Sequence, residues 1–110
     1  KMANTFKLKT KANVGVTTVG IYTAPASTTT VVIGITLANT SGSGVNVGVG
    51  ITRAGTTEDV KLLKNAPIPS GSSLEFMSGN KVVLEETDTV VVDSDTNNSV
   101  DASLTIMEIT

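Results

Sequence analysis

The sequence predicts an all-β fold, an antiparallel β-sandwich or jelly roll of about eight to nine short strands. Apolar and polar residues alternate along most of the chain, which is the pattern of a strand with one buried face. No segment shows the 3.6-residue apolar spacing of an amphipathic helix. Clusters of Gly, Ser, Asn and Asp, which favour turns, separate the alternating segments.

Two central segments show the alternation most clearly. In residues 45–51 the odd positions are valine or isoleucine and the even positions are asparagine or glycine, so the odd side chains are predicted to face a core. Residues 39–44, rich in Ser, Gly and Asn, precede this segment, and we expect them to form the turn of a hairpin with the strand before it. That earlier strand is predicted to bury the odd-numbered row Val31, Ile33, Ile35 and Leu37.

The remaining strands are predicted from shorter alternating segments. Polar residues 93–98 are expected to form a hairpin turn after a strand at residues 89–92. Pro67 and Pro69 cannot donate ladder hydrogen bonds, so residues 66–71 are predicted to be an extended crossover rather than the centre of a sheet. One face of the last strand is apolar, through Val100, Ala102, Leu104 and Ile106. The other expected strands are residues 6–10, 14–22, 60–64, 73–77 and 81–84.

The length of 110 residues fits one domain. We expect residues 1–110 to form a single β-sandwich domain, with residues 1–11 as an N-terminal arm or edge strand. Hydrophobic residues make up 39% of the chain and aromatic residues only 3%, so the core must consist of Val, Ile, Leu and Ala. No apolar segment approaches the roughly 20 residues needed to cross a bilayer, and no signal-peptide pattern is present, so no membrane partner is expected.

The side-chain chemistry argues against an enzyme. The chain contains neither His nor Cys, so the commonest acid-base group near neutral pH, the best thiol nucleophile and the preferred zinc ligands are all missing. Glu85, Glu86 and Asp88 could suggest the carboxylate pair of a glycosidase. Neighbouring residues of a strand point to opposite faces, however, so a solvated turn is the expected role of this segment. We predict no catalytic residues and no cofactor.

A second acidic segment resembles a calcium-binding loop in part. The spacing of its oxygen-bearing side chains matches the first, third, fifth and ninth positions of such a loop. Asn98 occupies the position that requires glycine, and Leu104 replaces the bidentate glutamate. We therefore predict a polar turn and no metal. The matching residues are Asp93, Asp95, Asn97 and Asp101.

Charge is divided unevenly along the chain. Residues 1–57 contain five basic and no acidic residues, whereas residues 58–110 contain three basic and ten acidic residues. This polarity could align neighbouring copies head to tail, but the basic residues are too sparse for a nucleic-acid site. We expect no nucleic-acid partner.

Two features suggest an interface with other protein surfaces. The apolar residues Phe6 and Leu8 alternate with lysines near the N-terminus, so they are candidate anchors on a neighbouring subunit, while the lysines would protect a strand edge or attract a partner. Glycine and threonine make the outward faces of the two central strands small and flat, which would allow close approach of a second sheet or leave a plain solvated face. The candidate interface residues are Phe6, Lys7, Leu8, Lys9, Gly34, Thr36, Gly48 and Gly50.

Several segments together resemble small virion structural proteins of tailed bacteriophages, particularly marine phages. They are MANTF (residues 2–6), YTAPASTTTVVIG (22–34), PIPSGSSL (67–74), KVVLE (81–85) with Asp88, and residues 104–109. The turn before Asp88 carries glycine in many such proteins, and here it carries Thr87.

The resemblance implies a capsid decoration or cement protein, or an accessory subunit of the neck, tail or fibre. Such a protein would form a homo-oligomer, bind copies of itself and a phage capsid or tail protein, and reside in the virion after assembly in the host cytoplasm.

Two other functions compete with this interpretation. An extracellular carbohydrate-binding or adhesive β-sandwich module would fit the Thr/Ser/Asn-rich surface, but only Tyr22, Phe6 and Phe76 could offer a ring for sugar stacking. A pilus-like subunit could polymerise by strand exchange with its N-terminal strand as the donor. Strand exchange predicts an unstable monomer and open fibres, whereas a closed oligomer favours the virion component.

Overall fold

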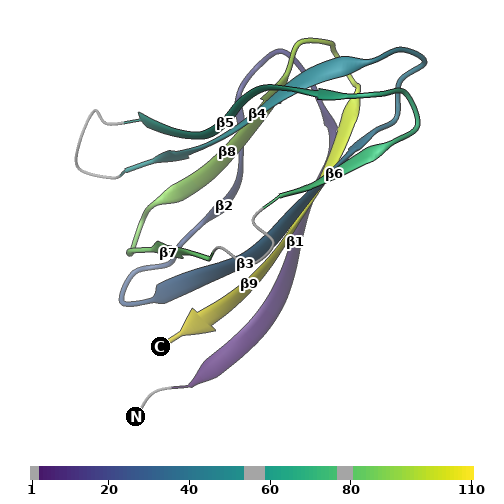
Figure 1. Ribbon diagram of the computed structural model, residues 1–110. Coiled ribbons are helices and arrows are strands. Elements are labelled where there is room, and N and C mark those ends of the chain that lie inside the picture. The colour runs from purple at the N-terminus through teal and green to yellow at the C-terminus, as the bar shows by residue number, and fades with distance from the viewer. Residues whose placement is uncertain (1–2, 54–58, 77–80) are drawn as a thin grey trace.

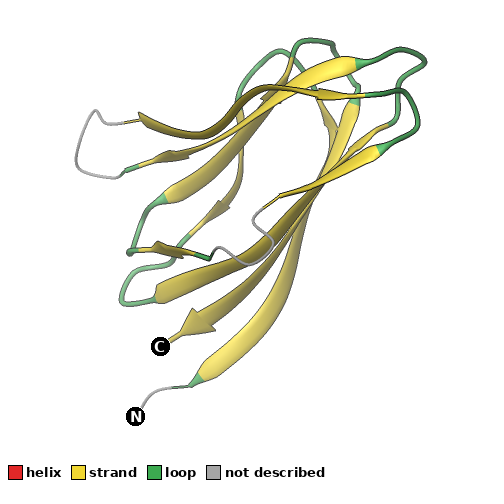
Figure 2. Ribbon diagram, in the orientation of Figure 1, coloured by secondary structure: helices red, strands yellow, loops and turns green. Residues whose placement is uncertain are grey.

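The computed structural model describes residues 3–53, 59–76 and 81–110 as an all-β sandwich, which confirms the predicted fold class (Figures 1 and 2). Two antiparallel sheets pack face to face. Sheet A has the order β1-β9-β3-β6, with β7 also paired to β3, and sheet B has the order β2-β8-β4-β5. No described element is a helix long and apolar enough to cross a membrane. The strands are β1 (Asn4–Val14), β2 (Val19–Thr23), β3 (Thr29–Asn39), β4 (Val45–Thr52), β5 (Asp59–Ile68), β6 (Ser73–Phe76), β7 (Val82–Leu84), β8 (Thr89–Ser94) and β9 (Val100–Ile109).

The core lies between the two sheets and consists largely of β-branched and leucine side chains, as composition predicted. In β4 the odd-numbered residues from Val45 to Ile51 are buried, which confirms the expected phase of that strand. In β9 the buried apolar residues are Val100, Ala102, Leu104 and Ile106, also as predicted.

The two predicted hairpins are wrong. Strand β3 lies in sheet A and β4 in sheet B, and the same division separates β9 from β8. The connecting loops therefore cross from one sheet to the other, so that the apolar faces of consecutive strands can pack against each other. Buried Asn39 stabilises the first crossing, because its amide nitrogen donates to the carbonyl oxygens of Ser43 and Ile68 at 2.8 and 2.9 Å.

The predicted apolar row of β3 is only half right. Ile35 and Leu37 are buried, but towards the start of the strand the buried positions are Thr30 and Val32. The pairing with β9 shifts register between Val32 and Gly34, which is a β-bulge. The extra residue changes which side chains face inward, so Val31 and Ile33 are not core residues.

The proline segment is placed as its chemistry requires. Pro67 lies near the end of β5, which is an edge strand of sheet B, so its missing N–H removes no ladder bond from the centre of a sheet. After Ile68 the chain passes through Gly71, at φ 73°, and joins sheet A as β6.

Glycines in β4 permit a close approach by β5. A Cβ atom on Gly50 would lie 2.8 Å from the carbonyl oxygen of Val60, and one on Gly48 would lie 3.4 Å from the carbonyl oxygen of Leu63. The β4–β5 pairing is irregular on both sides of Val49, which brings the β5 backbone over β4. Glycine is needed here for space, because a backbone oxygen cannot move aside as a flexible side chain can.

Substitution of Gly50 should therefore destabilise the fold, whereas substitution of Gly34 should not. We expect Gly50→Ala to lower the free energy of unfolding by about 1–3 kcal/mol through overpacking. Gly34 has no atom within 4 Å of an added Cβ, so Gly34→Ala should be neutral or stabilising by up to about 1 kcal/mol. Urea unfolding of the two variants measures the difference, and equal stability of both would refute the close-approach explanation.

Candidate assembly surface

Strand β1 is an edge strand of sheet A, paired along its length with β9. Lys7 lies opposite Ile106 and Lys9 opposite Leu104, both of which are buried in the core. Directly paired residues of an antiparallel sheet project to the same face. The lysines therefore lie on the inner face of the sheet, and Phe6 and Leu8 lie on its outer face.

The outer face of sheet A bears an apolar row that crosses four strands. Phe6 pairs with Met107, Met107 pairs with Val31, and Val31 pairs with Val83. The row therefore crosses β1, β9, β3 and β7, which lie side by side in that order in Figure 1. Leu8 and Ile109 flank these four residues.

The two ends of this row are strongly exposed. Phe6 is 69% exposed, Leu8 64% and Val83 59%. Met107, Val31 and Ile109 are half-buried. Together with the flanking residues, this set is called the apolar row, and its members are Phe6, Leu8, Val31, Val83, Met107 and Ile109. Apolar side chains gathered on one exposed sheet face are a usual mark of a protein interface.

The structure brings some of the predicted interface residues together and separates others. Gly34 lies two strands from Leu8, with β9 between them, since both pair with Thr105. Thr36 follows Gly34 on the same outer face. Gly48 and Gly50 belong to β4 in sheet B. The expectation that the glycines of two paired strands make one flat surface is therefore wrong, because the two strands are in opposite layers. An interface role for these residues stays a prediction.

The inner face of β1 contributes to a buried polar network that sequence reasoning did not find. The Lys7 ammonium lies 2.8 Å from Oε1 of Glu108, whose side chain is 8% exposed. The Tyr22 hydroxyl donates to Oε2 of Glu108 at 2.6 Å and lies 2.8 Å from the Thr30 hydroxyl. The network connects β1 and β9 of sheet A to β2 of sheet B. The sequence did contain a signal for this network. Glu108 continues the alternating positions of Val100 to Ile106, so a charged side chain stands where a buried one is expected.

The network shifts the pKa values of Glu108 and Tyr22, as expected for a carboxylate that is buried and hydrogen-bonded. The hydrogen bonds from Lys7 and Tyr22 lower the pKa of Glu108 below its ordinary value of 4.5. Burial, together with the hydrogen bond to Glu108, raises the pKa of Tyr22 to about 12. The proton therefore stays on Tyr22 and the carboxylate stays charged throughout the neutral range.

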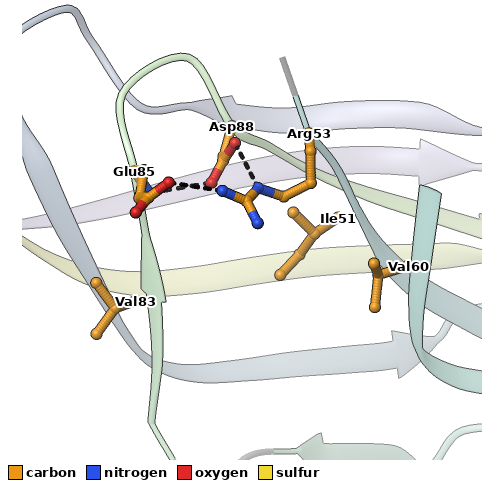
Figure 3. Close-up of a pocket in the computed structure, with 6 residues that line it drawn as sticks. All are labelled: Ile51, Arg53, Val60, Val83, Glu85 and Asp88. Carbon is orange, nitrogen blue, oxygen red and sulfur yellow. Dashed lines mark hydrogen bonds and ion pairs between the residues drawn. The ribbon is translucent and has the colours of Figure 1, made fainter. Parts of the chain in front are cut away.

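Two of the three carboxylates considered for glycosidase chemistry, Glu85 and Asp88, form a salt-bridged turn (Figure 3), and the third, Glu86, accepts the backbone N–H of Ser27. The Arg53 guanidinium reaches Glu85 at 2.6 Å and Asp88 at 3.0 Å, and Asp88 also accepts the backbone N–H of Glu85. Thr87, within this turn, has φ 66°, a conformation that favours glycine. These contacts close the connection between β7 and β8, and Arg53 attaches it to the end of β4.

Each of the three aspartates considered for calcium binding accepts a hydrogen bond from a different segment of the chain. Asp93 accepts from the Thr18 hydroxyl, Asp95 from the Asn46 backbone N–H, and Asp101 from the Asn13 backbone N–H. Among the described residues, no group of three or more carboxylate, His or Cys side chains is placed to bind a metal. The loop that crosses between β8 and β9 is thereby fastened to its neighbours.

Loss of the Glu108 charge should weaken the fold in a pH-dependent way. Because the pKa of Glu108 is lower in the folded protein, its stabilising contribution is complete above pH 4.5 and is lost as the pH falls through the folded value. We expect Glu108→Gln to cost about 1–3 kcal/mol at pH 7. The difference from wild type should shrink as the pH is lowered towards 3 in urea unfolding.

Asp59→Asn, at an exposed position of β5, is the matched control and should unfold at the same urea concentration as wild type at pH 7. A Glu108→Gln penalty that is constant with pH would contradict the charged network.

Comparison with known proteins yields likeness in fold only. No protein-family model matches the sequence, and no curated protein matches it. The fold is similar to that of a protein of the disulfide-linked pili that are Bacillus endospore appendages (TM-score 0.56, 16% identity, covering 98% of this chain and 86% of that one).

It is also similar to that of a capsid protein of Helicobacter pylori bacteriophage KHP30 (TM-score 0.57, 14% identity, covering 100% and 94%). A further match is a protein of the T13 particle of infectious bursal disease virus (TM-score 0.58, 14% identity), of which this chain spans only 30%. The structural neighbours are thus proteins of viral capsids and of a pilus.

Proposed function

We propose that this protein is a non-enzymatic structural subunit that assembles with copies of itself in the virion of a tailed bacteriophage. Its place there is that of a capsid decoration or cement protein, or of a neck or tail accessory subunit. The fold likeness to capsid and pilus proteins supports a structural role, and the sequence segments that resemble phage virion proteins support the narrower one.

The single observation that carries the proposal is the exposure of Phe6 and Leu8. Both are large apolar side chains, both point away from the core, and both are more than 60% exposed on the same strand. The same strand offers alternating lysines, so a sequence that needed only a solvated edge could have placed polar residues at these positions too. Burial against another subunit would remove this apolar surface from water.

A pilus-like assembly by strand exchange is the second candidate. It is favoured by the position of β1 at the edge of sheet A, and by the likeness to the spore pilus protein. Carbohydrate binding gains less support. Tyr22 is buried with its hydroxyl bonded, and Phe76 packs against the core, so of the three aromatic residues Phe6 alone presents a ring to solvent.

The test is the solution mass of the chain by light scattering over a concentration series. We expect wild type to form a discrete oligomer, and Phe6→Ser with Leu8→Ser to weaken its association by about tenfold or more, since both side chains are lost from the contact. The matched control is Val16→Ser, which removes a 55% exposed valine from a loop outside sheet A.

Circular dichroism should show that all variants fold, because exposed substitutions change stability little. A wild-type chain that stays monomeric at every concentration would contradict self-assembly. Electron micrographs separate the two candidates, since strand exchange predicts open fibres and the virion subunit a closed particle.

A further inference from the structure

We propose that the outer face of sheet A packs face to face on the same face of a second copy, about a two-fold axis that runs roughly along the strands. The inference rests on the proposed self-assembly and specifies its contact surface. Such an axis exchanges the two edges of the sheet, so β1 of one copy lies over β7 of the other, and β9 lies over β3.

The apolar row matches itself under this operation. Its four paired residues span the sheet at one level, over about 14 Å at the usual strand spacing. The axis brings Phe6 of one copy over Val83 of the other, and Met107 over Val31, so the most exposed side chains at the two ends of the row cover each other. Val83 belongs to the outer face because it pairs with outward-facing Val31 and is exposed.

The charges of this face do not oppose one another under the operation. The outward strand residues of sheet A include Glu75 on β6 and Asp101 on β9, and the register places no described lysine or arginine among them. Lys11 pairs with buried Ala102, so it lies on the inner face of β1 with Lys7 and Lys9. The level of Glu75 corresponds through Thr36 and Ser103 to exposed Thr10 at the opposite edge.

Exchange of the edges therefore brings Glu75 of each copy over Thr10 of the other, and Asp101 over the small residues of β3. The acidic residues meet uncharged residues, and the apolar row lies at the uncharged part of the interface, which is the usual distribution in protein interfaces. Without outward basic residues, the face lacks the chemistry to bind nucleic acid or an anionic membrane.

The size of the face is sufficient for a specific dimer. Strands β1 and β3 are each 11 residues long. Strand β9 has 10 residues, and β6 and β7, which both pair with β3, have four and three. At the usual rise and strand spacing these strands give a face of roughly 650 Å². Two such faces bury roughly 1,300 Å², within the range of specific protein interfaces.

The experiment is a charge exchange read out as the dissociation constant from sedimentation equilibrium. Val83→Ser should weaken association by about tenfold, and Thr10→Glu should also weaken it, because it places a carboxylate opposite Glu75 of the other copy. The double variant Thr10→Glu with Glu75→Lys should restore the association that Thr10→Glu alone loses. Within one copy these two side chains are at opposite edges of sheet A, so restoration can come only from contact between copies.

Lys61→Glu, on exposed β5 of sheet B, is the matched charge control and should leave association unchanged. Thermal unfolding of each variant confirms that it folds. A wild-type oligomer that is insensitive to Val83→Ser, or a double variant that is not restored, would overturn the face-to-face arrangement while self-assembly stands. A wild-type monomer would overturn both.

Discussion

The ion pair between Lys7 and Glu108 is the interaction on which the character of the outer surface depends. Strand residues alternate between two faces, so a single inward contact fixes the direction of every other side chain in β1. Because Lys7 reaches the buried carboxylate at 2.8 Å, Phe6 and Leu8 point to solvent. A register shifted by one residue would bury the two apolar residues instead, and would leave Glu108 buried without its cation, which is costly.

The two sheets use their outer faces differently. In sheet B, the backbone of β5 lies close over Gly48 and Gly50, so part of that face is covered within the same chain. In sheet A, Gly34 has no neighbour within 4 Å of an added Cβ, and the apolar row beside it is open. The fold thus leaves the outer face of sheet A more open than that of sheet B.

The strands could be predicted from the sequence, but their partners could not. Alternation identifies a strand and its buried face because burial acts on each segment separately, as in β4 and β9. Pairing depends on contacts far apart in the chain. Polar loops such as residues 39–44 are compatible both with a hairpin and with a crossing between sheets. The bulge near Ile33 has one local signal, Gly34, since a glycine inside a strand often marks a bulge. The apolar residues on either side do not show where the register shifts.

The same limit applies to the candidate surface. Phe6 and Leu8 could be found because they alternate with lysines, and their outward direction follows from strand geometry alone. Met107, Val31 and Val83 were missed, because their apolar character is informative only once the register places them beside Phe6. Gly48 and Gly50 were assigned to the wrong surface for the same reason, since strand pairing decides which layer they occupy.

The most direct measurement is the concentration dependence of methyl NMR signals of the 11.2 kDa wild-type chain. The central claim is that copies meet through the outer face of sheet A. It predicts that signals of Leu8, Val83 and Met107 shift or broaden as concentration rises, while Val91 on the outer face of sheet B stays unchanged. Changes confined to sheet B or to the loops, or no change at any concentration, would contradict it.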